Sequence, residues 1–293
     1  DATDHLRAPQ IAEPPRNGEA ELWGALRLGL ADYVGKNGFS RVLLGLSGGI
    51  DSALVAALAA DALGPERVTA ISMPTRFNSE GTRSDAQRVA EALGVAFEER
   101  PIEHLREVFG EALPEASGLA SENLQARIRG MLLMTLSNQH GWLVLTTSNK
   151  SETACGYSTL YGDSAGGFAP IKDVPKTRVF ALARWLNERA GREVIPWSTI
   201  ERPPSAELRD DQRDDQSLPS YDVLDPILEA YVERDEGREE MIAAGMPGEV
   251  VDEVIRMVDR AEYKRRQAAP GIRITPKAFG KDRRLPITNR FGG

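Results

Sequence analysis

The sequence contains few of the residues that form disulfides, metal centres or membrane spans. Cys155 is the single cysteine in 293 residues, so an intrachain disulfide is excluded, which fits a reducing compartment. The three histidines, His5, His104 and His140, lie outside every motif described below, which argues against a histidine-based metal site. No apolar run is long enough to span a bilayer, and no secretory signal is visible. We therefore expect a cytoplasmic protein without a membrane partner.

Acidic residues outnumber basic ones, and the net charge is −8 at pH 7. This balance argues against a general nucleic-acid-binding protein. The charge is uneven, because residues 264–290 hold nine Lys or Arg and one acid, a net +8, and the rest of the chain carries −16. The basic segment is either a solvated tail or a mobile flap that closes on an anionic ligand, and charge alone leaves both open.

Short apolar runs alternate with helical patterns in the first half of the chain. The sequence predicts strands at 41–46, 67–73, 95–102 and 142–147. It predicts helices before and between them at about 19–34, 50–63, 84–93 and 121–138. Because most of the runs are apolar on both faces, we expect an α/β fold with a parallel sheet that helices cover on both sides.

Composition divides the chain into a linker and one domain. Residues 1–18 are Pro-rich, polar and aperiodic, which is typical of a linker. We expect one domain over residues 19–291, with an α/β core over 19–200 that becomes less regular after residue 150. The remainder is expected to contain a polar loop over 201–225 and an irregular helical segment with a basic closing tail over 226–291. Further helices are expected near 176–189, 226–234 and 247–266.

The segment GLSGGIDSA (45–53) follows a predicted buried strand and opens a predicted helix. Gly48 and Gly49 permit a tight turn whose backbone amides face outward. The helix N-terminus adds unpaired N–H groups and a partial positive charge, which suit a phosphate. Ser47 and Ser52 can donate hydroxyl hydrogen bonds to the same oxygens. The segment therefore predicts a phosphate-binding loop.

Asp51 makes the loop a candidate metal site as well. A carboxylate beside phosphates is favourable when a Mg²⁺ ion lies between them. The loop is not a Walker P-loop, because GxxxxGK[ST] is absent. The alternative is a Gly-rich strand–helix turn in which Ser47 or Asp51 only caps the helix.

The SGGIDS segment resembles the pyrophosphate-binding loop of the ATP pyrophosphatase superfamily, which includes NAD synthetase, GMP synthetase, asparagine synthetase and tRNA-modifying ligases. Further segments resemble NAD synthetase, and most closely the synthetase domain of its glutamine-dependent form, over about residues 19–291. They are ENLQARIRG (122–130), LTTSNKSE (145–152), GYSTLYGD (156–163), KDVPKT (172–177), RPPSAELRDDQ (202–212), LPSYDVLD (218–225), EYKRRQAAPGI (262–272) and FGKDRRLPITNRF (279–291).

The resemblance implies a Rossmann-like fold of the adenine nucleotide alpha hydrolase type and a two-step ligase reaction. The nicotinate carboxylate of deamido-NAD attacks the α-phosphorus of ATP, which releases pyrophosphate. Ammonia then displaces AMP and NAD is formed. ATP is the co-substrate and Mg²⁺ the cofactor. The alternatives are another adenylating amidotransferase, such as a GMP-synthetase-like enzyme, and an inactive nucleotide-binding module.

The resemblance also implies site residues, with Asp51 and Lys176 in catalytic roles and Asp51 and Glu152 as the metal ligands. The implied ATP-binding residues are Gly45, Leu46, Ser47, Gly48, Gly49, Ile50, Asp51, Ser52, Thr147, Lys176 and Ser205. The implied deamido-NAD-binding residues are Asn123, Arg127, Glu152, Tyr157, Lys264 and Lys281.

Each of these residues has a structural alternative. Asn149 stands three residues before Glu152, a capping-box spacing, so from spacing alone Glu152 is equally a helix cap or a ligand. Periodicity alone would place Asn123 and Arg127 on a solvated helix face. Ammonia-only synthetases carry Lys in a TKYGD motif where this chain has Leu160, so that substrate contact is absent or replaced, with Lys264 and Lys281 as candidates.

The source of ammonia is the remaining question. Glutamine-dependent relatives carry a separate N-terminal glutaminase domain, and none is visible in this sequence. We expect the chain to be a piece of such a protein that by itself uses free ammonia. The resemblance also implies a homo-oligomer, a dimer or larger.

Overall fold

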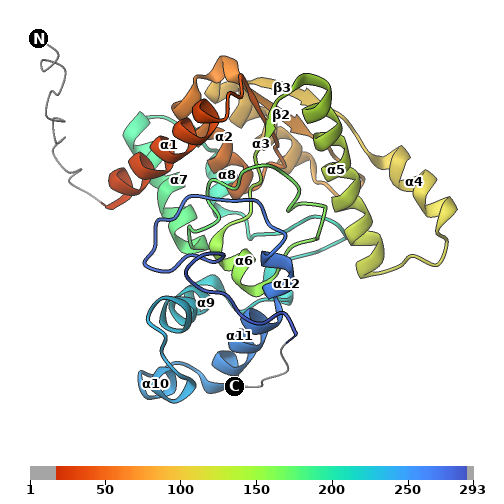
Figure 1. The fold of residues 1–293 in the computed structure, drawn as a ribbon. Helices are drawn as coiled ribbons and strands as arrows, with labels where there is room; N and C mark the ends of the chain where they lie inside the picture. The colour runs from red at the N-terminus through yellow and green to blue at the C-terminus, as the bar shows by residue number, and fades with distance from the viewer. Residues whose placement is uncertain (1–17, 289–293) are drawn as a thin grey trace, which may run out of the picture.

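A four-stranded parallel sheet is the centre of the computed structural model, which describes residues 18–288 (Figure 1). The strands are β1 (Val42–Gly45), β2 (Val68–Ser72), β3 (Ala96–Glu99) and β4 (Leu143–Val144), in the order β3-β2-β1-β4. All neighbouring strands pair in parallel, so the predicted parallel α/β sheet is confirmed.

Two of the predicted strands differ from the sequence pattern. β3 lies at the edge of the sheet and is mostly exposed, so it is the strand that is not apolar on both faces, and it is shorter than the predicted 95–102 run. β4 is only two residues long, because the chain after Val144 leaves the sheet and forms a single bridge between Leu145 and Phe168. The shortened strand delivers residues 146–149 to the carboxyl edge of the sheet.

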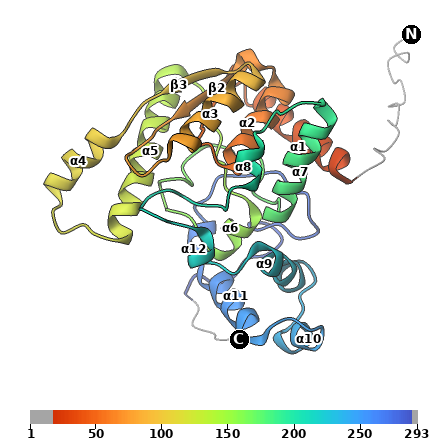
Figure 2. The ribbon, with the colours of Figure 1, turned by 180° about the vertical axis from the view of Figure 1, so that it is seen from behind.

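Helices cover both faces of the sheet (Figures 1 and 2). On one face, α2 (Ile50–Leu63) lies between the sheet and the outer helices α1 (Gly18–Lys36) and α7 (Lys176–Ala190). Most of its side chains are buried, because both of its sides meet protein and its alanines allow close approach. α5 (Leu119–His140) packs on the other face together with α4 (Glu103–Ala112). Successive side chains of β1 point to opposite faces of the sheet, so this strand packs against the helices on both sides.

The remaining elements surround this core or form the C-terminal part. They are the α-helices α3 (Glu80–Leu93), α6 (Lys150–Cys155), α8 (Trp197–Glu201), α9 (Tyr221–Leu228), α10 (Arg238–Ala243), α11 (Gly248–Arg260) and α12 (Glu262–Arg265), the 3-10 turns Pro65–Arg67 and Asp214–Gln216, and the π-turn Glu229–Glu233. Helices α4, α8 and α10 were not expected from the sequence, and α6 was indicated only by the capping-box spacing of Asn149 and Glu152. The helix expected at 247–266 is divided at Ala261 into α11 and α12, and the one expected at 226–234 begins earlier, at Tyr221.

A second apolar cluster lies in the C-terminal helices, below the sheet in Figure 1. Leu224 and Ile227 of α9 pack with Val254 and Val258 of α11, and Ala154 of α6 joins the same cluster. Helix α6 therefore contacts the helical part with one side, while its N-terminus lies at the carboxyl edge of the sheet.

The basic segment is only partly a solvated tail. Arg265 is 5% exposed, and its guanidinium donates to the carbonyls of Ala154 and Val258. Lys150 is buried and its Nζ lies 3.0 Å from Asp173, 2.7 Å from Glu233 and 2.6 Å from the Thr275 hydroxyl. This buried ion cluster attaches the C-terminal segment to the core. Arg290 lies outside the described residues.

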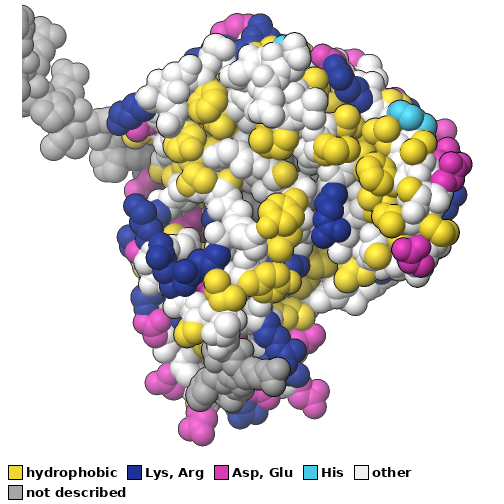
Figure 3. All heavy atoms as spheres, turned by 45° about the vertical axis from the view of Figure 1, so that its right-hand side comes forward, with side chains coloured by type: hydrophobic (Ala, Val, Ile, Leu, Met, Phe, Trp, Pro, Cys, Tyr) yellow, Lys and Arg dark blue, Asp and Glu magenta, His cyan; other side chains and the backbone are white. Residues whose placement is uncertain are grey.

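Exposed apolar side chains gather on the side that carries α4 and α5. Figure 3 turns this side toward the viewer and shows yellow side chains between dark blue basic ones. Leu119 and Met131 of α5 and Val108 of α4 are at least half exposed. Contiguous apolar surface is typical of protein contact faces, whereas single exposed apolar residues are common on any surface. The homo-oligomer stays a prediction. Among the helices within residues 18–288, none combines the length and apolar character needed to cross a membrane.

The buried ion cluster predicts a large stability effect. Lys150→Met removes the ammonium and leaves the Asp173 and Glu233 carboxylates without their shared cation, so we expect the free energy of unfolding to fall by about 3–5 kcal/mol. Urea denaturation followed by circular dichroism measures it. The control is Lys36→Met on α1, whose exposed pair with Asp32 should contribute less than about 0.5 kcal/mol. Equal losses for the two variants would contradict the account.

Candidate active site

The turn between β1 and α2 has a backbone that requires glycine. Gly48 has φ +85°, and a Cβ there would lie 2.0 Å from the carbonyl oxygen of Thr82. The Ser47 and Ser52 hydroxyls lie 3.1 Å apart, and the Gly49 amide donates to the Ser47 hydroxyl. Gly49 is the N-cap of α2 and has no side-chain cap, so neither Ser47 nor Asp51 serves as the helix cap that the alternative interpretation required.

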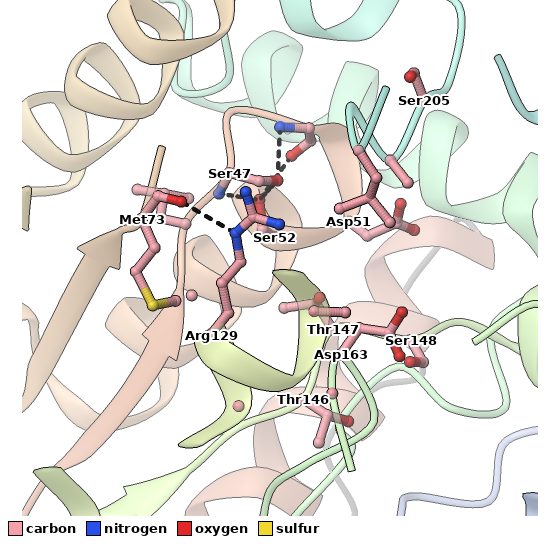
Figure 4. Close-up of a pocket in the computed structure, with 18 of the residues that line it drawn as sticks. Ser47, Asp51, Ser52, Met73, Arg129, Thr146, Thr147, Ser148, Asp163 and Ser205 are labelled. Atoms are coloured by element: carbon pink, nitrogen blue, oxygen red, sulfur yellow. Dashed lines mark hydrogen bonds between the residues drawn. The ribbon is translucent and has the colours of Figure 1, made fainter. Parts of the chain in front are cut away.

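A cavity of about 260 Å³ opens beside this turn at the carboxyl edge of the sheet (Figure 4). Open parallel sheets bind ligands at this edge. One end is apolar, with Ile71, Met73 and Leu133, and the other is polar. The implied site residues that line the cavity are Gly45, Leu46, Ser47, Gly49, Ile50, Asp51, Ser52, Thr147, Glu152, Tyr157, Lys176 and Ser205.

A buried lysine joins two carboxylates at the polar end. Lys176 Nζ lies 2.5 Å from Asp51 Oδ2 and 3.1 Å from Glu152 Oε1. The Asn149 amide donates to the other oxygen of Asp51 at 2.8 Å. Burial alone would lower the pKa of Lys176, but the two carboxylates outweigh it and raise the pKa. The group is therefore a charged ammonium held between two acids.

Glu152 has both of the roles that its spacing left open. The Asn149 side chain and Glu152 form a capping box at the start of α6, so the helix-cap interpretation is confirmed. The same carboxylate also faces the cavity and the Lys176 ammonium. Burial raises the pKa of Glu152 above its ordinary range, and the Lys176 charge opposes that shift.

The polar loop before α9 contributes an acid that the sequence did not indicate. Asp214 is buried and accepts hydrogen bonds from the hydroxyls of Tyr157 at 3.3 Å and Tyr221 at 2.9 Å. Burial raises the pKa of Asp214, and burial followed by the charge of Asp214 raises the pKa of Tyr157. Tyr157 is therefore a neutral hydrogen-bond donor on the cavity wall.

Arg129 is a second cavity residue that sequence reasoning missed. Its Nε donates to the Met73 carbonyl at 3.0 Å, and the residue lines the same cavity as Ser47 and Ser52 (Figure 4). Burial lowers the pKa of Arg129 to about 10, and within residues 18–288 no carboxylate lies within ion-pair distance of it. Arg127, two residues earlier, is exposed and donates to the Leu160 carbonyl. Positions two apart point to nearly opposite sides of a helix, so the two arginines face different surroundings.

Five implied site residues lie outside the main cavity. Gly48 is part of the turn, but the side on which a Cβ would stand faces Thr82 and not the cavity. Asn123 accepts a hydrogen bond from the Thr159 hydroxyl, and Arg127 is exposed. Lys264 donates to the carbonyls of Gly156 and Ser158, and Lys281 is exposed. For Asn123, Arg127, Lys264 and Lys281 a substrate contact therefore stays a prediction.

Asp51 and Glu152 are the residues that could hold a metal ion. Within residues 18–288, no cluster of three or more His, Cys, Asp or Glu side chains is arranged to hold a metal by itself. Mg²⁺ typically takes one or two carboxylates, with substrate phosphates and water as its other ligands. The two carboxylates already share the Lys176 ammonium, so their oxygens converge on one cationic position. The pair therefore fits Mg²⁺ bound together with a phosphate ligand.

Comparison with known proteins places the chain and its fold in one family. The parallel sheet and its glycine–serine turn define a Rossmann-like nucleotide-binding protein of the PP-loop type. The chain belongs to the NAD synthase family, which it matches over residues 22–268.

Relatives are similar over most of the chain. The glutamine-dependent NAD(+) synthetase of Xanthomonas campestris pv. campestris is 51% identical over 283 residues, which are 94% of this chain and 51% of that protein. The structure of glutamine-dependent NAD+ synthetase from Acinetobacter baumannii in complex with ADP has 48% identity, a TM-score of 0.64, and covers 95% of this chain and 51% of that one. The NH3-dependent NAD synthetase from Campylobacter jejuni, in complex with nitrate, has 29% identity, a TM-score of 0.71, and covers 85% and 96%. The chain spans about half the length of the glutamine-dependent relatives.

The turn between β1 and α2 is held from behind by Arg202, which is paired with a buried acid. Arg202 lies 2.5 Å from Asp85, which is 3% exposed, and 3.5 Å from the Gly48 carbonyl. The Thr199 hydroxyl donates to the same carbonyl at 3.3 Å. Arg202 therefore links the turn to α3. Arg88 contacts the same Asp85 but not the loop.

This arrangement predicts different effects for the two arginines. Arg202→Ala should weaken ATP binding about tenfold, which is about 1.4 kcal/mol, because the Gly48 carbonyl loses a positive neighbour and the turn becomes less fixed. Arg88→Ala removes a partner of the same carboxylate, yet should leave ATP affinity within about twofold. Isothermal titration calorimetry measures both affinities. Similar affinity losses in the two variants would show that Asp85 acts through general stability instead.

Proposed function

We propose that this chain is the synthetase part of a NAD synthetase, which converts deamido-NAD to NAD with ATP and ammonia. The observation that carries the proposal is the Lys176 ammonium between Asp51 and Glu152, directly beside the Ser47–Ser52 turn. It combines a phosphate-binding loop, a cation and two potential metal ligands in one cavity. Membership in the NAD synthase family and the ADP complex of the Acinetobacter relative support the nucleotide assignment.

In the first step, the carboxylate of deamido-NAD attacks the α-phosphorus of ATP. Negative charge moves onto the leaving pyrophosphate, so positioning and charge stabilisation supply most of the catalysis. The amides and hydroxyls of residues 47–52 hold the phosphates, and the N-terminus of α2 points its partial positive charge at them. Lys176 supplies the positive charge that is closest to the loop acid.

Asp51 and Glu152 would hold Mg²⁺ in the working enzyme. When bound, the ion neutralises part of the phosphate charge. Thr147 and Ser205 line the same cavity and contact ATP in this proposal. Glu152 and Tyr157 line the same cavity and contact deamido-NAD in this proposal, while Asn123, Arg127, Lys264 and Lys281 remain candidates for the rest of that dinucleotide.

In the second step, ammonia displaces AMP from the activated carboxylate. Only neutral ammonia has the free electron pair for this attack. The Campylobacter relative is named an NH3-dependent enzyme and has nearly the length of this chain, which supports free ammonia as a sufficient nitrogen source.

An assay of the 293-residue chain tests the proposal. We expect NAD to form from deamido-NAD, ATP, Mg²⁺ and ammonium, with AMP and pyrophosphate in equal amounts. Glutamine should not replace ammonium in the absence of a glutaminase, and xanthosine monophosphate should not replace deamido-NAD. Absence of NAD with folded protein, all three substrates and Mg²⁺ present would refute the assignment, and AMP release with xanthosine monophosphate would favour the GMP-synthetase-like alternative.

Asp51→Asn separates catalysis from binding. The substitution keeps the shape of the side chain but removes the charge that faces Lys176 and the proposed metal. We expect kcat to fall about 100-fold or more, with the Kd of deamido-NAD within about threefold of the original. Asp32→Asn on the exposed side of α1 is the control and should leave both unchanged. Parallel losses of kcat and deamido-NAD affinity would mean that Asp51 maintains the fold.

A further inference from the structure

Helix α7 begins without a cap from its own residues. Its N-cap is Pro175, which makes no side-chain cap, and its first residue is Lys176, the cation of the candidate active site. The first backbone N–H groups of a helix have no partner within the helix, so they need acceptors from elsewhere. At this end of α7 the acceptors come from α6 and α9.

One buried carboxylate, Asp225 of α9, organises these contacts. Its Oδ2 accepts the backbone N–H of Thr177 at 2.8 Å and the Thr177 hydroxyl at 2.7 Å. Its Oδ1 accepts the hydroxyl of Ser151, whose oxygen in turn accepts the backbone N–H of Lys176 at 2.9 Å. Ser151 is fully buried and Asp225 is 7% exposed. A single hydrogen-bonded network therefore holds the first two amides of α7.

This network lies one residue away from both partners of an active-site ion contact. Ser151 directly precedes Glu152 in α6. In α7, Thr177 directly follows Lys176. The distance of 3.1 Å between Lys176 Nζ and Glu152 Oε1 therefore depends on how the first turns of α6 and α7 are placed relative to each other. Asp225 fixes this placement, because it accepts hydrogen bonds from both helices.

The same side of α9 also meets the lysine side chain. Tyr221 stands four residues before Asp225, a spacing that puts both side chains on one side of a helix. The Tyr221 ring centroid lies 5.2 Å from Lys176 Nζ, within cation–π distance. Helix α9 packs against both α6 and α7 (Figures 1 and 2). One helix of the C-terminal part therefore contacts the ammonium of Lys176 and holds the backbone that carries it.

The alternative is that Asp225 is only a helix cap that stabilises the fold. In the part of the chain that the structure describes, its carboxylate has no cation within ion-pair distance, since Lys150, Lys176 and Arg178 pair with other acids. Burial of a carboxylate without a cation is costly. A Ser, Thr or Asp at position 175 would cap α7 without that cost. Only a carboxylate from another element also fixes α7 relative to α6, which favours a role at the site.

We propose that Asp225 is a positioning residue, which holds the Lys176 ammonium in its place in the active site. The inference rests on the proposed function, in which Lys176 supplies positive charge during adenylation. Asp225 does not line the main cavity, and it acts through the Ser151 hydroxyl and the backbone of α7. A charged group displaced by about 1 Å can lower a rate about 100-fold, because stabilisation of developing charge depends on its position.

Asp225→Ala tests the proposal in the deamido-NAD-dependent exchange of pyrophosphate into ATP, which reports adenylation alone. We expect kcat to fall about 30-fold with the KM for ATP within about threefold, because the lysine is displaced while the turn at residues 47–52 is intact. Asp225→Asn keeps an oxygen for the Thr177 amide and should recover kcat to within about fivefold of the original. The matched control is Asp259→Ala in α11, whose carboxylate accepts the Tyr231 hydroxyl at 2.8 Å. It should leave kcat within about twofold.

Circular dichroism at the assay temperature checks that each variant is folded, so that loss of kcat is separated from loss of folded protein. If Asp225→Ala does not fold, Thr177→Val and Ser151→Ala each remove one hydroxyl of the network and should each lower kcat about fivefold. Folded variants that keep kcat within about twofold, or an equal loss in Asp259→Ala, would overturn the inference and leave Asp225 as a structural cap. If the unsubstituted chain supports no exchange, the proposed function fails and the inference falls with it, which is a different result.

Discussion

The contact of the Lys176 ammonium with Asp51 and Glu152 is the interaction on which the rest of the site depends. It joins three separate elements: the start of α2, the capping box of α6 and the first residue of α7. Each carboxylate would be costly to bury alone, and the lysine would be too, so the three groups are stable only together. Because the turn before α2 and the start of α6 follow the adjacent parallel strands β1 and β4, the sheet brings their charges to one edge.

Local chemistry explains what the sequence could predict. The 50–63 helix and the turn before it were found from GLSGGIDSA, because two glycines after an apolar run determine the backbone without help from distant residues. The parallel sheet followed from the alternation of strands and helices, and the structure confirms it. The spacing of Asn149 and Glu152 also identified the helix cap, although spacing could not show that the same carboxylate reaches Lys176.

Tertiary packing explains what the sequence could not predict. Arg127 and Arg129 look alike in a polar helix pattern, and only the docking of α5 on the sheet decides that Arg129 is the one in the cavity wall. Asp214 lies in a segment whose composition is that of a solvated loop. In the structure it is buried and accepts hydrogen bonds from the hydroxyls of Tyr157 and Tyr221. The edge position of β3 likewise depends on the order of the strands, which the sequence pattern leaves open.

The central claim is that the cavity binds a nucleotide triphosphate through the loop at residues 47–52, with a magnesium ion at Asp51 and Glu152. A crystal structure of the chain soaked with a non-hydrolysable ATP analogue and Mg²⁺ measures this directly. The account predicts phosphate oxygens within hydrogen-bond distance of the loop amides and of the Ser47 and Ser52 hydroxyls, and metal density that both carboxylates contact. A nucleotide bound elsewhere, or an empty cavity at saturating ligand, would contradict it.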